Sequence, residues 1–144
     1  MTAYATQADL APYIDGATLI QLTDDDRNGI ADAPVITGIL DDVSARIDAA
    51  LKAAGYTTPV AAPGAALRSL TARLSLAALY GRRPAVEAPP SITTVAEAAE
   101  KELQLIGAGK VQPPEAIRLS SPTGPSGIAT STDAARNWDD AELF

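Results

Sequence analysis

Apolar side chains recur every three or four residues along three long stretches of the chain, a spacing that places them on one face of an α-helix. In the clearest stretch the apolar positions are Val35, Ile36, Ile39, Leu40, Val43, Ile47 and Leu51. Asp32 is suited to cap the start of this helix, and Pro34 loses no hydrogen bond in a first turn. The pattern predicts a long amphipathic helix between Asp32 and Gly55.

Two further long helices are predicted downstream. From about Gly64 to Tyr80 apolar residues cover much of the helix circumference, so we expect this helix to be the central and most buried one. The sequence Gly81-Arg82-Arg83-Pro84 should end it, with cations near its carbonyl end. The third helix is TTVAEAAEKELQLIG, whose predicted buried stripe is Val95, Ala98, Ala99, Leu103 and Ile106.

Two shorter elements come before the long helices. Thr6 and Asp9 have the spacing of a capping box, and the element they begin should end at Asp15-Gly16. A second apolar piece, ATLIQL, leads into an acidic loop. Together these elements predict an all-α fold, a small helical bundle of about four to five helices.

The chain changes character after Lys110. The stretch from Leu119 to Thr132 carries no charge and is rich in Gly, Pro, Ser and Thr, which is typical of extended chain. We therefore expect a helical bundle domain, 1–111, and an extended C-terminal arm, 112–144. The only Trp and the only Phe, Trp138 and Phe144, lie near the end of this arm. Since aromatic anchors dominate many interfaces, they favour docking onto a neighbouring subunit or partner over folding back onto the bundle.

Composition narrows the chemistry. The 144 residues include no Cys and no His, and the net charge is −7. Disulfides, thiolate nucleophiles and most zinc or copper sites are therefore excluded, and a metal site would have to be built from oxygens, which suit calcium or magnesium. The acidic balance disfavours binding to nucleic-acid phosphates. No cofactor is expected, and because neither a signal peptide nor a membrane-spanning stretch is visible, we expect synthesis in the cytoplasm.

The acidic loop QLTDDDRNGIAD is the strongest candidate for a chemical site. Set against an EF-hand loop, carboxylate and amide ligands fall at the first, third, fifth and ninth positions, which are Asp24, Asp26, Asn28 and Asp32. The twelfth position is Val35 where a bidentate carboxylate is needed. A turn explains the same residues, because Asp and Asn favour tight turns and Gly29 supplies a positive φ. The sequence therefore favours a turn, with weak calcium binding as the alternative.

No catalytic arrangement is recognised elsewhere, so we expect the protein not to be an enzyme. Asp139-Asp140 reads as a terminal acidic face, and Ser69 and Ser75 have no Lys or His nearby in the sequence to activate them. Arg82 and Arg83 allow two interpretations. They could pair with acids on a neighbouring chain, or they could cap a helix.

Four stretches of the chain carry a family resemblance in their order. They are YATQADL, LIQLTDDDRNGIADAPVI, DVSARIDAALKAAGYTTPV and LRSLTARLSLAALYGRRP. The similarity as a whole spans roughly residues 2–110. In this order they resemble the Mu-like phage head–tail connector family, the adaptor or head-completion proteins. An Arg-x-aromatic-Asp stretch at Arg136 could extend the similarity.

The resemblance implies a non-enzymatic virion structural protein, a head–tail adaptor that forms an oligomeric ring between the portal and the tail or stopper. It would be made in the host bacterial cytoplasm and reside in the virion neck. Its implied partners are the portal protein, a stopper or tail-terminator protein and copies of itself, with DNA passing through the channel without sequence-specific binding and no membrane involved. The expected contact residues of the arm and helix end are Arg82, Arg83, Arg136, Trp138, Leu143 and Phe144. The alternative is a small calcium-stabilised protein-interaction module that uses the Asp24–Asp32 loop.

Overall fold

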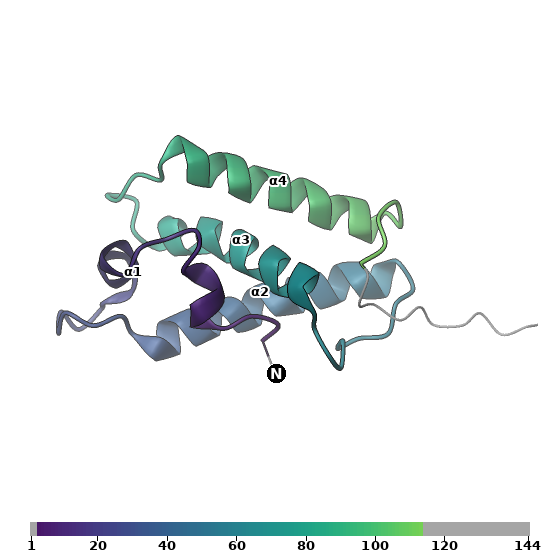
Figure 1. Ribbon diagram of the computed structural model, residues 1–144, viewed down its shortest axis with the longest axis horizontal. Coiled ribbons are helices and arrows are strands. Elements are labelled where there is room, and N and C mark those ends of the chain that lie inside the picture. The colour runs from purple at the N-terminus through teal and green to yellow at the C-terminus, as the bar shows by residue number, and fades with distance from the viewer. Residues whose placement is uncertain (1–2, 114–144) are drawn as a thin grey trace, which may run out of the picture.

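The computed structural model describes residues 3–113, and every regular element over that range is helical (Figure 1). The elements in chain order are the 3-10 helix η1 (Gln7–Leu10), α1 (Gly16–Thr23), α2 (Ala33–Ala53), α3 (Ala65–Arg82) and α4 (Pro90–Gly107). The predicted all-α bundle is confirmed. The predicted arm, 112–144, lies outside the described residues except for its first two positions. None of the described helices combines the length and the apolar character needed to cross a membrane.

The helix α3 is the central element of the bundle, as predicted. It packs against α2 and α4, which also pack against each other, and it contacts η1 and α1 (Figure 1). A helix that is apolar around much of its circumference must be covered on several sides, and α3 is covered in this way. Its buried polar side chains Thr71 and Ser75 donate to the carbonyl oxygens of Leu67 and Thr71, each at 2.7 Å, so both hydroxyls are paired inside the helix.

Within residues 3–113 the core consists of two apolar clusters that follow one another along the bundle. The first joins the beginning of α3 to the later parts of α2 and α4, and includes Leu51, Leu70 and Leu103. The second joins the end of α3 to η1, α1 and the beginning of α2. Because η1 and α1 cover this second cluster, they fix the end of the bundle where α1 runs into the acidic loop.

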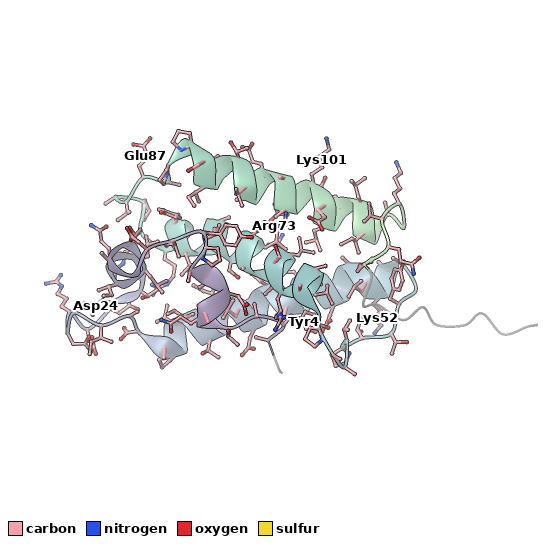
Figure 2. All side chains as sticks on the ribbon, viewed as in Figure 1. Tyr4, Asp24, Lys52, Arg73, Glu87 and Lys101 are labelled. Atoms are coloured by element: carbon pink, nitrogen blue, oxygen red, sulfur yellow. The ribbon has the colours of Figure 1, made fainter. Side chains whose placement is uncertain are left out.

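Tyr4 ties the N-terminal segment to the bundle (Figure 2). Its side chain is buried, and its hydroxyl donates to the carboxylate of Asp48 and accepts the backbone N–H of Val60 at 2.8 Å. Its own backbone N–H donates to Ser44 Oγ at 2.9 Å. Burial, reinforced by the hydrogen bond to Asp48, raises the pKa of Tyr4 to about 12.

The short N-terminal elements follow their capping signals, with one correction. The predicted capping box is present, since the Asp9 carboxylate accepts the backbone N–H of Thr6 at 2.7 Å. Asp15, which we expected to end the first element, instead begins the next. Its carboxylate accepts the backbone N–H of Thr18 at 2.7 Å and caps α1.

The ends of the long helices and one buried stripe also differ from expectation. The helix α4 begins at Pro90, before the predicted start at Thr93, because a proline in the first turn costs no hydrogen bond. The helix α3 continues through Arg82. The buried stripe of α4 is Ile92, Ala96, Ala99, Leu103 and Ile106, whereas Val95 is only half-buried and Ala98 is exposed. In an alanine-rich helix two neighbouring faces are nearly equally apolar. Because α4 begins earlier than predicted, Ile92 belongs to the helix and adds apolar area to the face that is observed to be buried.

Candidate functional site

The acidic loop connects α1 to α2 at one end of the bundle, where Asp24 is labelled in Figure 2. The loop is built from hydrogen bonds between its own side chains and backbone. The carboxylate of Asp24 accepts the backbone N–H groups of Asn28 at 3.0 Å and of Gly29 at 2.9 Å. Arg27 and Gly29 adopt positive φ values of 61° and 81°. The expected glycine turn is therefore present, and a second left-handed residue precedes it.

Asp26 and Asn28 continue the same network. The Asn28 amide donates to Asp26 at 3.0 Å, and its carbonyl oxygen accepts the backbone N–H of Ile30 at 2.8 Å. The bond from Ile30 is one of the local side-chain to backbone bonds that make Asp and Asn good turn residues, and the bond to Asp26 links two side chains of the turn. Each hydrogen bond is an exposed one, so the network specifies the shape of the loop more than it adds to the free energy of unfolding.

Asp32 does not cap α2 as predicted. It stands at the N-cap position of α2, but its side chain makes no capping hydrogen bond. Its carboxylate instead accepts the backbone N–H of Asp25 at 2.9 Å, across the neck of the loop. The loop places the free backbone N–H of a residue seven positions earlier within reach of the Asp32 carboxylate, and this N–H takes the place of the capping partner.

The calcium alternative is supported by part of the expected ligand set. One carboxylate oxygen from each of Asp24, Asp26 and Asp32 lies within 4.8 Å of the others. Carboxylate oxygens are suitable calcium ligands. The oxygen of Asn28 is used by Ile30, however, and Val35 provides no bidentate carboxylate. These residues fit a weak, incomplete calcium loop and do not fit a standard EF-hand site.

The electrostatics of Asp24 agree with a turn that is stable without a cation. Partial burial acts to raise the pKa of Asp24, but the hydrogen bonds from the backbone N–H groups of Gly29 and Asn28 outweigh it and hold the pKa below its usual value. The protein therefore stabilises the charged form of this carboxylate with its own backbone donors.

Two arginines at the end of α3 hold the acidic loop, and we call these contacts the arginine clamp. Arg82 and Arg83 each pair with the carboxylate of Asp25, at 2.6 Å and 2.7 Å. Arg82 also donates to the carbonyl oxygen of Leu22 at 2.7 Å, and Arg83 donates to that of Asp24 at 3.0 Å. Arg82 therefore joins the last turn of α1 to the loop, and Arg83 binds the beginning of the loop.

The arginine clamp is formed within one chain, and contact of Arg82 and Arg83 with a neighbouring chain stays a prediction. Arg82 does satisfy a free carbonyl at a helix end, but the helix is α1 and not the helix to which Arg82 belongs. Sequence reasoning missed the acidic partner, Asp25, because it lies more than fifty positions away from the arginines. It is also the one acidic residue of the loop that does not fall at a ligand position of the EF-hand pattern. The remaining predicted contact residues, Arg136, Trp138, Leu143 and Phe144, lie outside the described residues.

The loop also presents an apolar side chain that the sequence did not single out. Ile30 is 65% exposed and is the most exposed large hydrophobic residue between residues 3 and 113. Its backbone N–H is bound to Asn28, so the side chain projects from a fixed turn. A rigid loop loses less conformational entropy when it binds a partner, which makes this end of the bundle a candidate contact surface.

A comparison with models of protein families gives a match. The family model described as Bacteriophage Mu, Gp36 matches residues 4–127, which include the whole bundle and the beginning of the predicted arm. No significant match is found among curated proteins or among solved structures.

Proposed function

The chain belongs to the Bacteriophage Mu Gp36 family, and from this we propose that it is a non-enzymatic structural protein of a Mu-like phage virion that joins the head to the tail. In this proposal it acts as a head–tail adaptor, an oligomeric ring in the neck between the portal protein and the tail or a stopper or tail-terminator protein. The family match is the observation that carries the proposal. The order of sequence motifs, which resembles head–tail connector proteins, supplies the specific role.

A ring made from copies of one chain needs two different contact faces on each subunit, because its interfaces are heterologous. The bundle offers two chemically different ends. One carries the arginine clamp and the exposed Ile30, and at the other the last described residue, Pro113, packs beside Leu67 near the start of α3. The arm would leave from that second end and reach a neighbouring subunit or the portal. This arrangement supports a ring with arm exchange between subunits.

The net charge of −7 supports the second part of the proposal, that DNA passes the ring without binding to it. A protein that binds the phosphate backbone needs clustered Lys and Arg side chains. In the described bundle, four arginines are instead paired with acids of the same chain, namely Arg46, Arg73, Arg82 and Arg83. Such a wall would repel phosphates and let the duplex slide.

The decisive experiment is electron microscopy of lysates from a phage or prophage that lacks this gene, complemented with the full chain or with a chain deleted from Leu119 to Phe144. We expect the deletion to give complete tails beside unjoined heads, and the full chain to restore joined particles. The truncated chain should fold, as judged by its helical circular dichroism, and fail to restore joining. Joined particles in the deletion lysate would refute the adaptor proposal.

A calcium-stabilised interaction module is the second candidate, favoured only by the convergence of Asp24, Asp26 and Asp32. A ligand at ten times its Kd raises the free energy of unfolding by about 1.4 kcal/mol, a shift that a thermal melt resolves. The melting temperature would be compared in calcium and in chelator for the wild type, for Asp24→Asn, and for Asp42→Asn as an exposed control outside the loop. Equal shifts in the wild type and in both variants, or no shift in the wild type, would rule out this function.

A further inference from the structure

An open apolar groove runs along the surface between α3 and α4. It has a volume of about 550 Å³, and the apolar part of its lining, which we call its floor, consists of Leu76, Ala77, Tyr80, Ala88, Ile92 and Ala96. Most large apolar side chains between residues 3 and 113 are buried, so an open surface that is apolar over this volume is unusual for the molecule. Volumes of this size are typical of sites that bury a ligand or a few large side chains.

The rim of the groove is polar and lies mostly on α4. Glu100 is engaged by Arg46 of α2 at 2.8 Å, whereas Lys101 forms no ion pair within residues 3–113. Glu97 stands beside them and adds a negative charge. The floor therefore offers apolar area, and the rim offers a single uncommitted cation at which an acidic occupant can be oriented.

We propose that the occupant of this groove is the chain's own C-terminal segment, Trp138–Phe144. The segment has the sequence WDDAELF and contains the only Trp and the only Phe of the protein, with Leu143 next to the Phe. Aromatic residues of this kind are the ones that fill apolar pockets at interfaces. Its carboxylates suit Lys101, and its apolar side chains suit the floor between Leu76 and Ala96.

The intervening chain is long enough to reach the groove from the last described residue. The described chain ends at Pro113, beside Ala66 and Leu67 at the start of α3, and 24 residues separate it from Trp138. A flexible chain of that length spans roughly 25–30 Å on average. The eighteen residues of α4 are about 27 Å long. Effective concentration is greatest when the average reach of a linker equals the span it must cover, so the segment reaches its own groove more readily than that of another copy in dilute solution.

This inference does not depend on the proposed role in joining heads to tails. If that role is correct, docking of the segment would keep the arm folded back in the free subunit, and the same groove would accept a neighbour's segment during assembly. Failure of phage joining and failure of docking are measured separately, because docking is tested on the purified full chain.

The tryptophan fluorescence of the protein reports the environment of Trp138, since the chain contains no other tryptophan. In the full-length wild type we expect a blue-shifted emission maximum and weak quenching by acrylamide. Ala77→Glu places a charge on the groove floor at an exposed position, and Ala78→Glu places the same charge one residue further along α3, outside the groove. We expect Ala77→Glu to shift the emission and the quenching constant to those of free N-acetyltryptophanamide, and Ala78→Glu to leave both as in the wild type.

Each possible result decides the proposal. Solvent-like emission from Trp138 in the wild type would overturn it without any variant, and so would equal behaviour of Ala77→Glu and Ala78→Glu when circular dichroism shows both to be folded. A blue shift that disappears on dilution would show that the segment binds a second copy, which also overturns docking onto its own chain. A blue shift that is independent of protein concentration and is lost only in Ala77→Glu would establish it.

Discussion

The hydroxyl of Tyr4 gives a sharp test of how the N-terminal segment is held. Tyr4→Phe removes one oxygen and keeps the buried ring. The backbone N–H of Val60 then loses its acceptor in a largely buried position, and Asp48 loses a donor. The matched control is Tyr13→Phe, whose hydroxyl lies 3.2 Å from Ser69 Oγ at a partly exposed site.

The expected destabilisation by Tyr4→Phe is about 2–4 kcal/mol. A buried donor left without a partner costs about 1–3 kcal/mol, and a hydrogen bond to a charged group contributes about 1.5–3 kcal/mol, and the two effects overlap. For Tyr13→Phe we expect about 0.5–1 kcal/mol, the value of an ordinary hydrogen bond. Chemical denaturation followed by helical circular dichroism measures both, and the melting temperature should fall by roughly 10 °C or more for Tyr4→Phe.

The pH dependence provides an independent check on the same group. The folded pKa of Tyr4, about 12, lies above its usual value. A raised pKa contributes stability that is fully present below about pH 10, the ordinary tyrosine pKa, and that is lost as the pH rises through the folded value. The gap between the wild type and Tyr4→Phe should therefore narrow by up to about 2 kcal/mol between pH 10 and 12. Equal destabilisation by the two Phe variants, or parallel pH profiles for the wild type and Tyr4→Phe, would refute this account.

Three further predictions concern the loop end of the bundle. Asp25→Asn weakens the arginine clamp and should lower the free energy of unfolding by about 1 kcal/mol, since the ion pairs are partly exposed. The exposed control Asp42→Asn should change the free energy of unfolding by less than about 0.5 kcal/mol in the same denaturation experiment. The hydrogen bonds from the side chain and backbone of Thr18 hold the pKa of Asp15 low, so the contribution of Asp15 to the free energy of unfolding is present above about pH 4 and is lost as the pH falls. Asp15→Asn can still cap α1 and should make the loss of stability toward acid pH shallower. An unchanged dependence of stability on pH would contradict this. Ile30→Ser should change stability by less than about 0.5 kcal/mol because the side chain is exposed, and a larger loss in thermal melts would show that Ile30 is part of the fold.

The long helices could be predicted from the sequence because each is specified by a local pattern. The periodicity of α2 and the apolar circumference of α3 required no knowledge of the rest of the chain. The stripe of α4 was misplaced because Ala96 and Ala98 are equivalent to a pattern that counts only apolar residues. Their burial depends on where the helix meets α3, which is a tertiary property.

The candidate site could be predicted only where its structure is local in sequence. The turn residues of the acidic loop act locally, and Gly29 was placed correctly. The contacts between residues distant in sequence could not be predicted, because nothing in the sequence relates Asp25 to Arg82, or Asp32 to the backbone of Asp25. Side chains with several possible partners, such as a carboxylate at an N-cap, are assigned correctly only when the competing donors have been placed in space.

The arginine clamp also explains how a loop rich in carboxylates can be a fixed surface without a metal ion. Repulsion among neighbouring acidic groups would normally favour an open loop, but Arg82 and Arg83 neutralise Asp25 from outside, and backbone N–H groups bind Asp24 from within. A calcium ion would therefore add stability to an existing turn and would not create the turn. Because the turn is already formed, Ile30 is presented in one orientation, and binding through it loses little conformational entropy. In the proposed ring, this preformed end is suited to be one contact face of the subunit, and the arm, whose first two residues lie at the opposite end of the bundle, would provide the reach.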